Sequence, residues 1–150
     1  MIRVCDHICQ DECTCYASDV GTQKNRAFSL DRFFRALADP TRLRLINLIA
    51  GQELCVCYLV IVIDAPQPKV SRHLAYLRQA GIVAARREGK WMHYRLTTPA
   101  DGHAAAILKT TIDSLKRDKE MQRDLQRLSQ ACRGPQSLVQ VMGAPAPVQV

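Results

Sequence analysis

Apolar residues recur at helical spacing through most of the chain, from about residue 29 to residue 132. Ser29 can cap a first helix, in which Leu30, Phe33, Phe34 and Leu37 follow at helical spacing. This helix should stop near residues 39–40, because a residue that precedes proline is pushed out of the helical region. A second helix then follows up to about residue 50, with a glycine directly after it.

The middle of the chain has a different pattern. The run LCVCYLVIVID is rich in β-branched residues that favour a strand, but we interpret it as a short buried helix because another helix follows it closely. Pro66 and Pro68 mark a turn and the start of that next helix, in which Val70, Leu74 and Leu77 form one apolar face. IVAARR and KWMHYRL are then two short strands of a hairpin, joined across residues 88–89.

The two ends of the chain differ from its centre. A long last helix is predicted from Asp101 toward Cys132. Residues 1–28 form a polar, cysteine-rich N-terminal arm, and residues 133–150, rich in Pro, Gly, Ala and Val, are expected to be a disordered tail. The predicted domain, residues 29–132, is therefore mainly α with a β-hairpin wing (an α+β chain), and a helix-turn-helix followed by a hairpin is a winged helix-turn-helix.

The positive charge of the chain is concentrated in this helix and hairpin. The whole chain has a formal net charge of +7, and residues 67–95 hold seven Lys and Arg residues but one acid, Glu88. An ordinary solvent-exposed surface would carry positive and negative residues together. This excess of positive charge in one segment favours double-stranded DNA as the partner.

A docking geometry follows from the order of the elements. The helix after the turn should enter the major groove, where Gln67 and Arg72 can contact base edges and Lys69 and Ser71 can contact phosphates. The predicted DNA-binding set also includes His73 on this helix and the hairpin residues Arg86, Arg87 and Lys90. One such helix covers few base pairs, so we expect a homodimer that joins through the first and last helices.

The composition also bears on compartment and catalysis. No run approaches the roughly 18 apolar residues of a membrane span, and the N-terminal residues are charged where a signal peptide is apolar. We therefore expect a cytoplasmic protein without a membrane partner. The sequence contains no nucleophile–base pair, phosphate loop or paired acids, so we expect no enzyme.

Seven cysteines are many for a chain that is expected in a reducing compartment. Cys55 and Cys57 are one residue apart near a predicted helix N-terminus, where the helix dipole favours thiolate. They could simply pack in the core, but thiolates also select soft ions. Two sulfurs rarely complete a site; arsenite takes three, and cadmium or lead three or four. The N-terminal arm offers more, namely Cys5, Cys9, Cys13 and Cys15.

Four segments together carry a family resemblance. FFRALADPTRLRLINLI, ELCVCYL, PQPKVSRHLAYLRQAGIV and ARREGKWMHYRL resemble the ArsR/SmtB family of metal-sensing winged-helix repressors. The resemblance implies a metal-free dimer on operator DNA that a soft metal or metalloid releases. It implies a metal site at Cys55 and Cys57, and the spacing of Cys5 and Cys9 is similar to the cadmium/lead-sensing branch, in which an N-terminal pair joins the ELCVC pair of the partner subunit. Cys13 and Cys15 are possible additional ligands.

Several alternatives remain open at this point. As(III) or Sb(III) is the first candidate effector, with Cd(II) or Pb(II) as the alternative, and a thiol-based redox or persulfide sensor on the same fold is a further one. Tyr58 stands where many ELCVC sequences have Asp, and we expect it to alter the helix surface. The resemblance also identifies a second family metal site on the last helix, but only Asp101 and His103 match it, since Ser114 and Arg117 replace its other ligands. We therefore expect His103 to be an ordinary helix residue.

Overall fold

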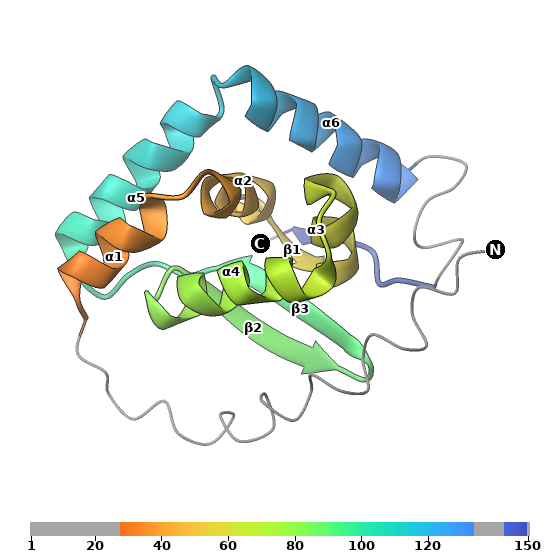
Figure 1. Cartoon of the computed structure of the whole chain (residues 1–150), viewed down its shortest axis with the longest axis horizontal. Coiled ribbons are helices and arrows are strands. Elements are labelled where there is room, and N and C mark those ends of the chain that lie inside the picture. Colours follow the sequence, from red (N-terminus) through yellow and green to blue (C-terminus); the bar gives the residue numbers. More distant parts are fainter. Residues whose placement is uncertain (1–27, 134–142, 150) are drawn as a thin grey trace.

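The computed structural model describes residues 28–133 and 143–149 of the 150-residue chain. The cysteine-rich arm and its Cys5, Cys9, Cys13 and Cys15 lie outside the described residues. Within them the elements, in chain order, are α1 (Leu30–Leu37), α2 (Pro40–Ile49), β1 (Gln52–Cys55), α3 (Val56–Ile63), α4 (Gln67–Gln79), β2 (Val83–Glu88), β3 (Trp91–Leu96), α5 (Gly102–Leu115), α6 (Lys119–Arg133) and β4 (Val148–Gln149) (Figure 1).

Side-chain caps fix the starts of three helices. The Ser29 hydroxyl accepts the backbone N–H of Arg32 at 3.3 Å, which confirms the predicted start of α1. Asp39 accepts from the N–H of Arg42 at 2.9 Å, so the residue that ends the first helix also caps α2. Asp101 caps α5 in the same way. Such caps satisfy N–H groups that the helix itself leaves unpaired.

The helix-turn-helix consists of α3, a short turn and α4. Asp64 ends α3 in the left-handed conformation, with a φ of 56°, and aspartate tolerates this region better than most residues. Pro66 then precedes α4, whose buried face is formed by Val70, Leu74 and Leu77 as predicted.

The start of the LCVC run differs from its interpretation as helix. Residues 52–55 form strand β1, and the helix begins only at Val56. The reason is long-range pairing: Leu54 lies opposite Tyr94, and Cys55 opposite His93, in an antiparallel ladder with β3. The β-branched residues of this run were the local signal that favoured a strand, and the interpretation as helix set that signal aside.

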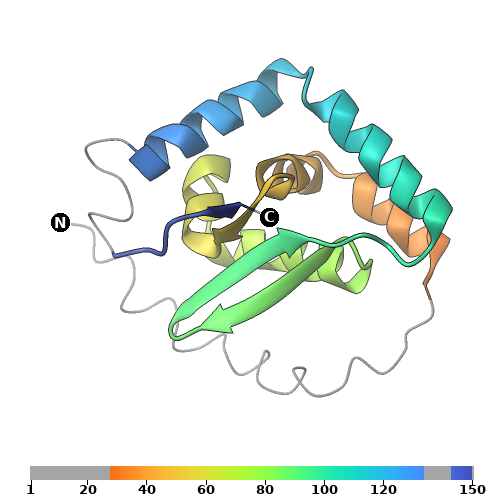
Figure 2. The ribbon, with the colours of Figure 1, turned by 180° about the vertical axis from the view of Figure 1, so that it is seen from behind.

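The hairpin β2–β3 forms the wing. Its strands pair from Val83 with Leu96 to Glu88 with Trp91, and Gly89 makes the turn with a positive φ of 58°. The four-stranded sheet has the order β2-β3-β1-β4, and Figure 2 shows the hairpin projecting along one side of it.

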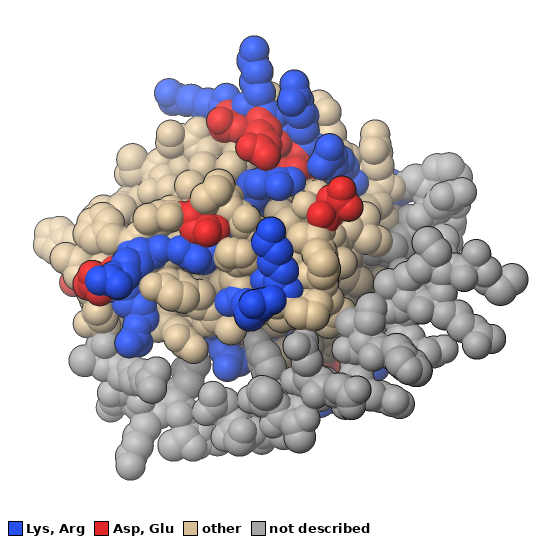
Figure 3. Space-filling view, viewed as in Figure 1, with Lys and Arg blue, Asp and Glu red and all other residues tan. Residues whose placement is uncertain are grey.

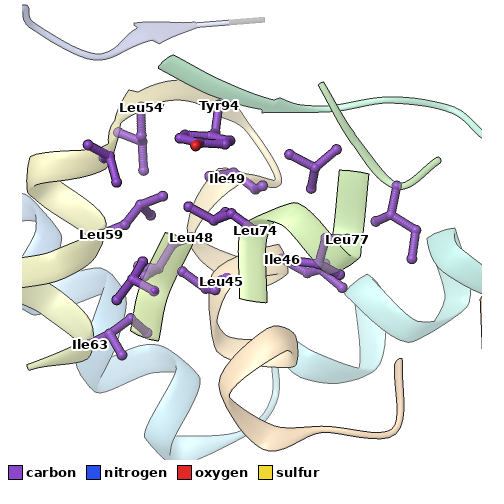
Figure 4. Packing of buried hydrophobic residues seen from close by; sticks show 14 of the residues in the cluster. Leu45, Ile46, Leu48, Ile49, Leu54, Leu59, Ile63, Leu74, Leu77 and Tyr94 are labelled. Atoms are coloured by element: carbon purple, nitrogen blue, oxygen red, sulfur yellow. The ribbon is translucent and has the colours of Figure 1, made fainter. Parts of the chain in front are cut away.

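The core lies between α2, α3, α4 and the inner side of the sheet. Figure 4 shows Leu45 and Leu48 of α2 beside Leu59 of α3, with Leu74 of α4 and Tyr94 of β3 close by. Each of these side chains is at most 2% exposed. Burial of such side chains supplies the main driving force for the fold, and it fixes α4 relative to the wing.

The predicted long last helix is wrong, because two helices occupy its place. The chain turns at residues 116–118, where the carboxylate of Asp118 accepts the N–H groups of Glu120 and Met121 and starts α6. Figure 1 shows α5 and α6 meeting at an angle above α2. This bend lets α6 return to the domain, where Asn47 donates its side-chain amide to the carbonyl of Met121.

The C-terminal residues that the structure describes also differ from the expected tail. Gln52 pairs with Gln149 and Glu53 with Val148, so β4 adds an edge strand to β1, and Ala144 is buried. The free edge of β1 and the β-branched Val148 explain this pairing. Within the described ranges, no helix combines the length and apolarity that crossing a membrane requires.

Candidate functional site

The two thiols of the LCVC run lie in contact. The Cys57 Sγ donates to the Cys55 Sγ at a distance of 2.9 Å, which is too long for a disulfide, and both cysteines are free. Cys55 is buried at the end of β1 and forms the N-cap of α3, while Cys57 in the first turn is partly exposed. The change from strand to helix between them turns both side chains to the same side.

This contact shifts the pKa values of the two thiols in opposite directions. The pKa of Cys55 is lowered, first by the hydrogen bond from the Cys57 thiol and then by backbone N–H groups that include Met92. The pKa of Cys57 is raised by the same hydrogen bond and by burial. Cys55 is therefore the more acidic thiol of the pair, and Cys57 is the donor in the hydrogen bond between them.

The pair is suited to a soft ion. A metal–thiolate bond is about 2.3 Å, so two sulfurs that share one ion at a near-tetrahedral angle lie about 3.8 Å apart. The sulfurs of this pair are 2.9 Å apart and would have to separate by about 1 Å to hold an ion together. In the part of the chain that the structure describes, no His, Cys, Asp or Glu joins the pair to form a group of three ligands. A third sulfur would have to come from beyond these residues or from a second chain.

Tyr58 lies inside the protein, which corrects its expected place on the helix surface. Its side chain is completely buried, and its hydroxyl is buried without a hydrogen-bond partner among residues 28–133 and 143–149. Burial, followed by the nearby Cys132, Cys57 and Cys55, raises its pKa to about 12. The Tyr58 side chain therefore packs in the hydrophobic core next to the thiols.

The predicted recognition helix presents its polar face outward. Lys69 and Arg72 are exposed, while Gln67, Ser71 and His73 are half-buried. Figure 3 shows Lys and Arg side chains over the face that carries α4. The Arg72 Nε donates to the Pro68 carbonyl at 3.2 Å, which holds part of this guanidinium along the helix.

Next to this face is a shallow cavity of about 440 Å³, lined by Arg42, Lys69, Arg72, His73 and Tyr76. Arg42 lies over the Tyr76 ring, with its guanidinium carbon 4.5 Å from the ring centre. Sequence reasoning did not place Arg42 beside α4, because Arg42 belongs to the first turn of α2 and this contact depends on how the two helices pack. His73 Nδ1 lies 3.6 Å from Asp39, and burial lowers the pKa of His73, so a neutral, structural imidazole is favoured.

The three basic wing residues are all exposed but differ in their contacts. Arg86 contacts Glu53 and Glu88, Arg87 donates to the Gly89 carbonyl, and the Lys90 ammonium lies 5.0 Å from the centre of the Trp91 ring. Trp91 packs partly, and Tyr94 completely, against the core.

The last two helices do not assemble a second metal site from the described side chains. The Asp101 carboxylate caps α5 by accepting the N–H of Ala104 at 2.8 Å, and His103 is exposed. Ser114 and Arg117 are exposed as well.

A helix-turn-helix with a basic outer face, a hairpin wing and a thiol pair at the start of the preceding helix defines a winged-helix transcriptional regulator. Residues 39–85 match the family model described as "Bacterial regulatory protein, arsR family". The chain is 44% identical to an arsenic resistance transcriptional regulator of Pseudomonas putida over 107 residues, which cover 71% of this chain and 82% of that protein. It is 47% identical to the arsenical resistance operon repressor of Escherichia coli over 78 residues, covering 51% of this chain and 67% of that protein.

A third relative is the transcriptional repressor SmtB homolog of Synechocystis, which is 39% identical over 92 residues, or 61% of this chain and 67% of that protein. Among solved structures, that of a possible transcriptional regulator for arsenical resistance is 34% identical and covers 65% of this chain and 96% of that one, with a TM-score of 0.45. By its sequence relatives, the chain belongs to the ArsR/SmtB family of metal-responsive transcriptional repressors. It is a regulator and not an enzyme.

Proposed function

We propose that the metal-free protein binds operator DNA as a homodimer and that a soft thiophilic ion releases it. The observation that carries this proposal is the contact of 2.9 Å between the sulfurs of Cys55 and Cys57 at the start of the helix that precedes α4. An ion held by both sulfurs replaces the hydrogen bond between them and changes the start of α3, which packs against α4 through the core.

As(III) or Sb(III) is the first candidate effector, because it needs only three sulfurs and because relatives at 44% and 47% identity are named for arsenic or arsenical resistance. The alternative is a four-thiolate Cd(II) or Pb(II) site with Cys5 and Cys9 of the cysteine-rich arm, residues 1–28. Cys13 and Cys15 are further possible ligands in either case.

For DNA binding, we propose that α4 enters the major groove with Gln67 and Arg72 at base edges and Lys69 and Ser71 at phosphates. Arg87 and Lys90, exposed on the wing, would reach the neighbouring backbone. His73 is half-buried beside Asp39, so in this proposal it supports the helix.

The dimer interface is proposed to include α1. Leu30 and Phe34 are 50% and 48% exposed there, beside a buried Phe33. The apolar residues of α5 and α6 are less available for a dimer, since Leu108, Met121 and Leu128 are buried within the chain itself. We therefore propose that α1 contributes most of the apolar contact and that the outer faces of α5 and α6 contribute the rest. Two large apolar side chains exposed on one helix are suited to an interaction surface.

The deciding experiment is fluorescence anisotropy of the reduced protein on DNA from upstream of its own gene, titrated separately with arsenite, antimonite, cadmium, lead and zinc. Cys55→Ser and Cys57→Ser should bind DNA normally and lose ion-induced release. Cys132→Ser, a partly buried cysteine on α6, is the matched control and should respond like the wild type. Loss of DNA binding in the Cys55 and Cys57 variants would instead assign these thiols a structural role.

The second candidate function is a redox or persulfide sensor. It is favoured by the same contact, because a thiolate touching a thiol is poised for oxidation. DNA release by peroxide or polysulfide without any added metal would support this reading over metal sensing.

A further inference from the structure

Glu53 joins the strand before the thiol pair to the wing. Its side chain is 8% exposed, and its Oε1 accepts the Arg86 Nε at 2.7 Å and lies 2.6 Å from the Arg86 Nη2. Arg95 Nε lies 4.0 Å from the other carboxylate oxygen, and His93 Nδ1 lies 3.8 Å from Oε1. A buried carboxylate is costly unless it is paired, so this contact is a strong constraint on the position of Arg86.

Arg86 differs in this respect from its neighbours on the wing. It lies between two carboxylates, since its Nη1 also contacts Glu88 at 2.5 Å. An arginine paired with two acids adds little net positive charge toward a phosphate. Its geometry is therefore better suited to fixing the wing than to contacting DNA directly.

The same group of residues is adjacent to the thiols. Cys55 lies opposite His93 in the β1–β3 ladder, and His93 lies opposite Arg86 in the β2–β3 ladder. Glu53 and Cys55 are two residues apart on one strand, so their side chains point to the same face of the sheet. Figure 2 shows β1 lying beside the hairpin. Cys55, His93 and Arg86 therefore lie side by side across three strands, and a shift of the end of β1 can displace Arg86 through His93.

We propose that Glu53 is the positioning residue that couples the effector site to the wing, an inference that rests on the proposed function. In the metal-free protein Glu53 holds Arg86 and thereby sets the wing for DNA. When Cys55 and Cys57 bind an ion, their sulfurs move apart from the 2.9 Å contact and the end of β1 shifts. The Glu53–Arg86 pair is then disturbed and the wing leaves its DNA-binding position. Coupling of this kind requires only that the two states differ in these contacts.

The test compares Glu53→Gln with Glu88→Gln in the full-length protein. Both substitutions remove one negative charge beside Arg86, but only Glu53 is linked to the thiols by a strand. The measured quantity is the ratio of the DNA dissociation constants with and without arsenite, repeated with cadmium. Ion binding is followed separately by the ultraviolet absorbance of the thiolate–metal bond.

In the wild type we expect a ratio in the range typical of allosteric proteins, about 5- to 150-fold. Glu53→Gln should bind the ion with an unchanged absorbance titration while its ratio falls below about 2-fold, and Glu88→Gln should keep the wild-type ratio. A wild-type ratio in Glu53→Gln would overturn the inference. A wild type that binds the ions without releasing DNA would overturn the proposed function itself, and the inference with it.

Arg86→Gln gives a second measurement from the exposed side of the pair, and it carries the test if Glu53→Gln does not fold. It should weaken DNA binding in the metal-free state and lower the ratio as Glu53→Gln does. The double variant should be no less responsive than either single variant, because both remove one and the same contact. Additive losses would show that the two residues act separately and would contradict the proposal.

Discussion

Arg44 of α2 and Asp124 of α6 form two hydrogen bonds, of 2.6 and 2.8 Å, although 80 residues separate them in the sequence. The Asp124 side chain is 2% exposed and that of Arg44 17%. This pair, together with the Asn47–Met121 hydrogen bond, fixes α6 against the core of the domain.

Removal of the buried carboxylate should therefore destabilise the protein. Asp124→Ala leaves Arg44 without its main partner, and we expect the free energy of unfolding to fall by about 3 kcal/mol. Urea unfolding followed by circular dichroism measures it. The matched control is Asp31→Ala, which breaks the exposed Asp31–Arg35 pair and should cost less than about 1 kcal/mol. Equal effects of the two substitutions would argue against a buried role for Asp124.

Tyr58→Phe should instead stabilise the protein. The hydroxyl is buried and has no hydrogen-bond partner within the part of the chain that the structure describes, so its removal relieves an uncompensated desolvation cost. We expect the free energy of unfolding to rise by about 1 kcal/mol, with ion-induced DNA release unchanged. Tyr58→Leu, which also leaves a cavity, should lose stability. A loss of stability in Tyr58→Phe would show that the hydroxyl is satisfied after all.

The stability of the protein should fall on mild acidification. Burial and the nearby Arg86 lower the pKa of His93 in spite of Glu53 and Glu88, and burial lowers that of His73. A histidine whose pKa is lower in the folded state contributes stability that is complete above its ordinary pKa, about 6.5, and is lost as the pH falls below it. We expect the urea midpoint to decrease between pH 7.5 and 5.5.

His93→Gln should reduce this decrease, because glutamine does not titrate. His103→Gln, at an exposed position of α5, is the control and should retain the wild-type slope. An identical pH dependence in all three proteins would exclude His93 as its source.

The recognition helix can be tested through salt dependence. Lys69→Ala should weaken binding to all DNA sequences alike and reduce the slope of log K against log salt by about 1. Arg72→Ala should cost about 1–3 kcal/mol and relax the preference at one base position. Lys116→Ala, which removes an exposed ion pair with Asp113 at the C-terminal end of α5, should change neither property. Anisotropy over a range of salt concentrations, on specific and random duplexes, separates these outcomes.

Much of the domain was predictable from local signals. Ser29, Asp39 and Gly89 mark ends and turns because each is suited to one particular backbone conformation. The face of α4 followed from the spacing of its apolar residues. These features depend on residues within a few positions of each other, which is the range over which sequence patterns are informative.

The features that sequence reasoning missed depend on distant partners. Strand β1 exists because Leu54 pairs with Tyr94, 40 residues further on, and β4 forms because that strand has a free edge. The bend at Asp118, whose carboxylate accepts the N–H of Glu120, was missed because helical spacing was expected to continue from Asp101 toward Cys132. The Glu53–Arg86 contact spans 33 residues, and neither residue alone indicates the other. The thiol pair was predictable as a pair, but the hydrogen bond between its two sulfurs follows only from the geometry.

Strand β4 has one more consequence. A strand with an unpaired edge offers its backbone N–H and C=O groups to any other polypeptide, which is a common origin of aggregation. Residues 148–149 occupy that edge of β1, directly before the thiol pair. The C-terminal segment thus prevents β1, the strand that leads to Cys55, from pairing with other chains.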